Sequence, residues 1–130
     1  MEMKRIVIVA GAALVTAASL TLALFLGSWG YDQRRFSLHE GRLRRLVERA
    51  PHRAQVVEGL RREESVEIGA ARGEAEMVWV ADRWGQGRRG LVLEKGRRWP
   101  EVRVFQAADM VYFLYFDDEG VLKDFVCVSR

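Results

Sequence analysis

The stretch IVIVAGAALVTAASLTLALFL, residues 6–26, decides how this chain of 130 residues is organised. It holds 21 residues without a charge, and its only polar side chains are Thr16, Ser19 and Thr21. Because a helix rises about 1.5 Å per residue, the stretch spans roughly 30 Å, the thickness of a bilayer's hydrocarbon core. A helix also pairs its own backbone groups, which lipid cannot do. We therefore expect one transmembrane helix over residues 6–26, preceded by an N-terminal tail over residues 1–5.

Two other interpretations of the apolar stretch exist. A cleaved signal peptide would also begin with basic residues, but its apolar run is shorter, about 7–15 residues. Its best cleavage site, residues 17–19, would leave an apolar stub from Leu20 onward on the mature chain. The third interpretation is a helix buried inside a water-soluble core. We favour a signal-anchor that stays in the mature protein.

The residues that flank the apolar stretch suit the membrane–water interface. Lys4 and Arg5 precede it, and Trp29 and Tyr31 follow at the depth where amphipathic aromatic rings settle. Basic residues beside the first end favour a cytoplasmic N-terminus, whereas the arginines beyond the second end lie farther from the lipid. We therefore expect a single-pass protein of a bacterial-type inner membrane, with its domain on the extracytoplasmic side.

Small residues recur along one face of the expected transmembrane helix. Ala13, Ala17 and Thr21 stand four residues apart. A face of small side chains lets a second helix approach closely, so these residues are helix-packing candidates. The alternative is that alanine is simply common in such helices.

The composition after the anchor is that of one small folded domain. Hydrophobic residues make up 49% of the chain and charged residues 30%. Without Glu2, Lys4 and Arg5, 19 basic and 17 acidic side chains remain, which is too balanced for a nucleic-acid-binding surface. Cys127 is the only cysteine, so the chain forms no internal disulfide.

The first half of this domain reads as two short helices after a linker over residues 27–36. Ser37 and Glu40 form a capping box, and Leu43, Leu46, Val47 and Ala50 follow at helical spacing in one apolar stripe. Pro51 ends that helix and suits the first position of a second one, over about residues 52–62.

The second half reads mainly as strands. Residues 65–69 alternate like a strand, residues 74–84 fit a helix or a strand equally well, and residues 91–93 are a possible strand. Residues 101–106 alternate, and MVYFLYF at residues 110–116 is apolar throughout, which predicts a central strand covered on both faces. Residues 117–120 form a turn, and residues 121–128 return as its partner. The predicted fold class is α+β: two short helices packed on a small antiparallel sheet, as one domain over residues 37–130.

Two patches of this domain carry a family resemblance. VVEGL at residues 56–60 and VYFLYFDDEGVL at residues 111–122 resemble the small SmpA/OmlA-type domain of outer-membrane assembly lipoproteins. The resemblance implies a non-enzymatic assembly or scaffolding module. The chain differs from that family because no lipid-accepting cysteine follows its apolar stretch, so a helix would anchor it instead.

Several short sequence motifs resemble those of known chemical sites but lack the flanking elements or the residue spacing that such sites need. GQGRRG at residues 85–90 spells a dinucleotide-binding fingerprint but is followed by no βαβ unit, so we expect a loop. The acidic residues 117–119 lack calcium-loop spacing and suit a solvated turn. His39 and His52 have no metal-binding spacing, and Cys127 suits a small buried position. The sequence predicts no catalytic, cofactor-binding or metal-binding residues.

The sequence does indicate surfaces for contact. Arg97, Arg98 and Trp99 form a bulky, basic group that we expect in a glycine-led turn, and these residue types anchor protein interfaces. The alternative is that Trp99 caps the core. Five Arg–Arg pairs, at residues 34–35, 44–45, 61–62, 88–89 and 97–98, suit solvated faces or lipid headgroups.

From these patterns we expect a non-enzymatic accessory subunit or assembly factor that acts by protein–protein contact at the membrane. Its partners would be the lipid bilayer and other membrane proteins, with no nucleic acid, small-molecule substrate or cofactor. The alternative is a ligand- or lipid-sensing extracytoplasmic module that holds an apolar ligand on one face of the sheet. That face would be lined by Tyr112, Leu114 and Phe116, or by Val111, Phe113 and Tyr115.

Overall fold

A computed structural model describes residues 34–129, and the folded domain begins at Phe36. Within residues 34–129, no helix has both the length and the apolar character that crossing a membrane requires. The expected tail, transmembrane helix and most of the linker lie outside the described residues. The interface and helix-packing candidates there stay predictions: Lys4, Arg5, Trp29, Tyr31, Ala13, Ala17 and Thr21.

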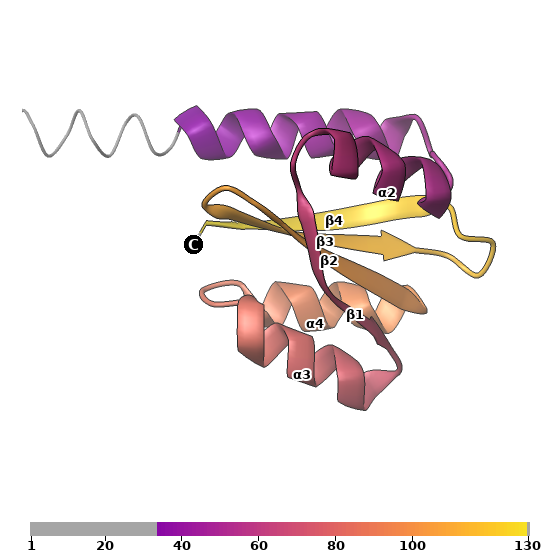
Figure 1. Ribbon diagram of the computed structural model, residues 1–130. Helices are drawn as coiled ribbons and strands as arrows, with labels where there is room; N and C mark the ends of the chain where they lie inside the picture. The colour runs from indigo at the N-terminus through magenta and orange to yellow at the C-terminus, as the bar shows by residue number, and fades with distance from the viewer. Residues whose placement is uncertain (1–33, 130) are drawn as a thin grey trace, which may run out of the picture. The chain divides into compact units, whose positions relative to one another are not determined.

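The domain is a four-stranded antiparallel sheet with a pair of helices on each face (Figure 1). The strands lie side by side in chain order. A helix that is described over residues 34–48 and α2 cover one face, and α3 and α4 cover the other. The elements are α2 (Arg53–Arg62), β1 (Val66–Arg72), α3 (Glu74–Trp84), α4 (Arg89–Arg98), β2 (Glu101–Ala107), β3 (Met110–Phe116) and β4 (Leu122–Ser129). The α+β class is confirmed, and residues 34–129 place four helices against the sheet, where we expected two.

β3 is the centre of the core, because each of its seven residues is buried. Its side chains alternate between two apolar clusters, since successive strand residues point to opposite faces. Val111, Phe113 and Tyr115 pack with α3 and α4, whereas Tyr112 and Leu114 pack with α2 and the helix over 34–48. The expectation of a central strand covered on both faces is confirmed. Both faces that we considered for an apolar ligand are therefore filled by helices.

The first two helices form where the sequence indicated, but their ends differ. Residues 34–36 are already helical, so Ser37 lies inside the first helix and does not cap it. α2 begins after His52, whose side chain accepts a hydrogen bond from the amide of Ala54 at 3.2 Å while Gln55 bonds back to the amide of His52. Pro51 therefore precedes the cap and is not the first helical residue. Its carbonyl instead accepts from the amide of Leu122 at 3.0 Å, which fastens this connection to β4.

Residues 74–84, which fitted a helix or a strand equally well, form a helix, and the strand expected over residues 91–93 is wrong. Residues 74–84 form α3, with Gly85 as its C-cap. Residues 91–93 lie within α4, where Val92 is fully buried. The apolar run Leu91–Leu93 is too short to define a period, and the helical spacing shows only when Val92, Lys95 and Trp99 are read together.

Close packing between α3 and β1 depends on Gly69. A Cβ built on Gly69 would lie 2.4 Å from the indole ring of Trp84. β1 also has its register shift at this position, between Glu67 and Gly69. Gly59, inside α2, is the opposite case, because nothing lies within 4 Å of an added Cβ there.

We predict opposite effects on stability for the same substitution at these two glycines. Gly69→Ala should lower the free energy of unfolding by about 1–3 kcal/mol, because Trp84 must move. Gly59→Ala should raise it by about 0.5–1 kcal/mol, because alanine favours a helix interior. Denaturant unfolding of the full chain in nanodiscs measures both. Equal effects at the two positions would contradict the packing of Trp84 on Gly69.

Candidate functional site

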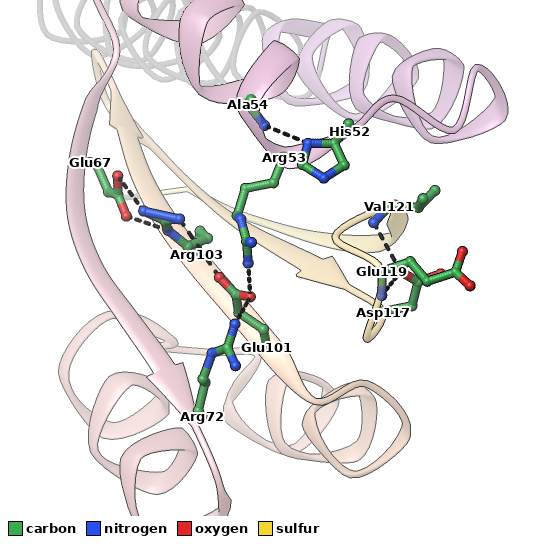
Figure 2. Close-up of polar contacts among 10 residues, drawn as sticks. All are labelled: His52, Arg53, Ala54, Glu67, Arg72, Glu101, Arg103, Asp117, Glu119 and Val121. Carbon is green, nitrogen blue, oxygen red and sulfur yellow. Dashed lines mark hydrogen bonds and ion pairs between the residues drawn. The ribbon is translucent and has the colours of Figure 1, made fainter.

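A buried carboxylate lies where β2 begins. Glu101 is 5% exposed and is the only buried charged residue in the part of the chain that the structure describes. Arg53 of α2 donates to it, Arg72 of β1 donates at 2.8 Å, and Arg103 lies 3.7 Å from its other oxygen. Arg103 also donates to Glu67 at 2.6 Å. Figure 2 shows these side chains converging on Glu101 from two strands and a helix.

This cluster is a structural joint. A carboxylate buried this deeply is costly unless charges and hydrogen bonds compensate it, and Glu101 has both. The joint ties α2, which covers one face of the sheet, to β1 and β2. It also holds the guanidinium of Arg72 at the end of β1, directly before Gly73, the N-cap of α3.

Beside this joint lies a pocket between the start of α3 and the end of α4. Its volume is ≈ 530 Å³, which is within the range of about 300–1,000 Å³ that small-molecule sites have. Its lining includes Met77, Val78, Leu93, Arg97 and Trp99, and we call it the Trp99 pocket.

The structure brings the three contact candidates together at this pocket. Arg97 and Arg98 are exposed in the last turn of α4, and Trp99 is its C-cap. Gly96 lies within α4, so the expected glycine-led turn is wrong. Trp99 packs against the core and also lines the pocket. Its indole Nε1 is buried without a hydrogen-bond partner in the described structure.

A second group on α3 was missed by sequence reasoning. Trp79 is 56% exposed and packs edge-to-face against Trp84, with ring centroids 5.4 Å apart. The guanidinium of Arg83 lies 5.3 Å from one ring centroid and 5.4 Å from the other. We call these three residues the Trp79 cluster. The spacing i, i+4, i+5 would have indicated it once residues 74–84 were assigned to a helix.

Most of the Arg–Arg pairs have an acidic partner nearby. One arginine in each of four pairs forms an ion pair, and three of these are four residues apart on a helix. Such exposed pairs contribute about 0–1 kcal/mol each, so they support solvated faces for these arginines. The paired residues are Arg44 with Glu40, Arg62 with Glu58, Arg89 with Asp82 and Arg98 with Glu94.

The other motifs have structural roles. The glycine-rich residues 85–90 follow α3 and run into α4, with a helix in place of the strand that a dinucleotide site needs before it. In the turn after β3, the carboxylate of Asp117 accepts from the amides of Glu119 and Val121 at 3.0 and 2.9 Å (Figure 2). His39 hydrogen-bonds to the hydroxyl of Tyr112, and His52 caps α2.

Cys127 is buried in β4. Burial and, to a smaller extent, the nearby charge of Glu40 raise the pKa of its thiol to about 12, although the charge of Arg88 opposes this rise. The nucleophile in cysteine chemistry is the thiolate, so the protonated Cys127 thiol is inert at neutral pH. The expectation of a small buried residue is confirmed.

Comparison of the chain with protein-family models, with curated proteins and with solved structures gives no match. The resemblance to the SmpA/OmlA-type domain therefore stays a prediction from the two sequence patches.

We predict that Glu101→Gln destabilises the domain. The variant removes the charge that compensates three arginines, and since those arginines are partly exposed we expect a loss of about 1–3 kcal/mol. Glu119→Gln, on the exposed turn after β3, is the matched control and should change stability by less than about 0.5 kcal/mol. Denaturant unfolding measures both, and a loss no larger than that of the control would show that the joint contributes nothing.

Proposed function

We propose that this protein is a non-enzymatic, single-pass membrane protein whose domain acts by contact with other membrane proteins. In this role it would be an accessory subunit or an assembly factor. The apolar stretch over residues 6–26 supports the membrane location, and the SmpA/OmlA resemblance supports the assembly role.

The observation that supports a contact role most is the Trp79 cluster. Large aromatic side chains and arginine are the residue types that contribute most at protein interfaces. Trp79 exposes more than half of its surface although its neighbours hold it in place. Because Arg83 and Trp84 already fix the orientation of the ring, binding a partner would cost little side-chain entropy.

A membrane anchor would strengthen such a contact. It confines the domain to the surface where its partners lie, which raises their effective concentration without any new contact. A small interface around one aromatic cluster would then be sufficient for association.

A ligand-sensing module is the second candidate. The Trp99 pocket is the observation that favours it, because its volume of about 530 Å³ is within the range of ligand sites. The pocket lies at the end of α4, and not on a face of the sheet where we first expected a ligand.

The contact role predicts that partners depend on Trp79. The tagged full chain should be recovered in the membrane fraction and, after extraction in mild detergent, should copurify with other membrane proteins. Trp79→Ala should lower the yield of those proteins about tenfold or more, as is typical of an interface tryptophan. Quantitative mass spectrometry of the purified fraction measures the yield.

Leu38→Ala is the control, because it also removes an exposed apolar side chain but from another helix. Recovery of the chain as a lone monomer, equal yields from both variants, or a chain that stays in the aqueous fraction would each contradict the proposal.

A further inference from the structure

We propose that the open edge of β1 pairs with the same edge of a second copy of this chain, so that two domains share one continuous antiparallel sheet. The inference rests on the proposed contact role, because it names a second copy as the partner at the Trp79 cluster. Other membrane proteins would then bind the paired domains. Three features lead to it: an open strand edge, matching charges along that edge and the side of α3 that flanks it.

The two edges of the sheet differ in how they are closed. Among residues 34–129, β1 and β4 each have a neighbouring strand on one side only. At β4, the ammonium of Lys95 donates to the carbonyl of Phe125 at 2.8 Å, and the carboxylate of Asp124 accepts from the amide of Phe125 at 2.8 Å. Side chains thus satisfy backbone groups that a further strand would need, which protects this edge from pairing.

β1 keeps its middle open. The amide of Arg72 turns away from β2, since it donates to the carboxylate of Glu76 at 2.6 Å. Outward and inward backbone groups alternate along an antiparallel strand, so the N–H and C=O of Ala70 also point away from β2. Ala70 is exposed and its side chain is small, so a second strand can approach it. β1 can therefore pair at Ala70, whereas Glu76 limits the pairing beyond Arg72.

The charges along β1 match those of a second copy. Ile68 is the extra residue at the register shift, because Glu67 and Gly69 face consecutive residues of β2. Glu67 and Arg72 therefore each lie two ladder positions from Ala70, on opposite sides of it. In an antiparallel pair centred on Ala70, Glu67 of each copy lies opposite Arg72 of the other. Opposite charges stabilise a cross-strand pair, and the two-fold axis makes this contact twice.

Both side chains can make these contacts while they keep the ion pairs of their own domain. The side chain of Arg72 is 71% exposed although it contacts Glu101, and its guanidinium carries five N–H donors. Glu67 contacts Arg103 and is 30% exposed. Figure 2 shows these two ion pairs along β1 and β2. Pairing of two copies would join them into one row in which acidic and basic groups alternate.

α3 supplies the apolar part of the contact. Glu76, Trp79 and Arg83 lie three and four residues apart, so they form one stripe along the helix. The bond between Glu76 and the amide of Arg72 shows that this stripe flanks the open edge. Two-fold pairing of β1 brings the second α3 to the same side of the joined sheet, running in the opposite direction. The two stripes then face each other and bury the exposed ring of Trp79.

Disulfide cross-linking of the full chain in membranes tests the pairing. Ala70→Cys should give a dimer on oxidation, because opposed residues of a hydrogen-bonded antiparallel pair have Cα atoms about 5.5 Å apart, within the reach of a disulfide. Cys127 is buried, so the unchanged chain should give no dimer. Lys123→Cys, at an exposed position on β4, is the matched control for random collision. Equal dimer yields from Ala70→Cys and Lys123→Cys overturn the proposal.

The register is tested with two differently tagged chains in one membrane. Glu67→Cys on one chain should cross-link to Arg72→Cys on the other. Neither variant should cross-link to itself, because identical residues would lie about 13 Å apart along the paired strands. Cross-linking of each variant to itself at the same yield as to the other contradicts a pair centred on Ala70.

The contribution of α3 is tested in the Ala70→Cys chain. Adding Trp79→Ala should weaken the association about tenfold or more, as is typical of an interface tryptophan, and should lower the dimer yield accordingly. Adding Leu38→Ala, which removes an exposed apolar side chain from another helix, should leave the yield unchanged. Equal yields from the two double variants overturn the role of the α3 stripe.

The outcomes separate this inference from the contact role. Mass spectrometry of the cross-linked product shows whether it holds two copies of this chain or a different protein. Two copies support the pairing, and a different protein joined at residue 70 overturns it while the contact role stands. If no product forms, the pairing is wrong; the contact role then stands if Trp79→Ala still lowers the yield of copurified proteins, and fails if it does not.

Discussion

The structure depends on one constraint, which is that β3 has no face that can meet water. All seven of its residues are buried, so the sheet needs an apolar cover on both sides. Two helices before β1 supply one cover, and two helices between β1 and β2 supply the other. The hydrophobic effect thereby explains why the chain forms α3 and α4 between β1 and β2, although these two strands are neighbours in the sheet.

Polar groups in this domain mark the places where the layers are joined. The hydroxyl of Tyr115 donates to the carbonyl of Val92 at 2.8 Å, which fastens β3 to α4. Glu101 joins α2 to the first two strands in the same way. Because the two faces of the sheet are filled, the surfaces of residues 34–129 that can serve recognition include the outside of the helices and their ends. The Trp79 cluster and the Trp99 pocket lie in such places.

Much of the sheet could be predicted because β2 and β3 carry a clear period or a continuous apolar run. The type of structure at α3 could not be decided, since Met77–Val80 is a continuous apolar run that fits the spacing of a helix and of a strand alike. α4 was missed because Gly90 and Gly96 weaken its helical pattern. At the candidate site, Arg97 and Trp99 were found from residue type alone. The role of Glu101 was not, because its partner Arg53 lies 48 residues away in the chain.

Native-state hydrogen exchange on the full chain in nanodiscs tests the central place of β3 most directly. If β3 is enclosed by both helix pairs, its amides should exchange only through global unfolding, and more slowly than those at the free edge of β1. Amides of β3 that exchange as fast as those of the edge strands would show that the helices do not cover the sheet, and would contradict this account.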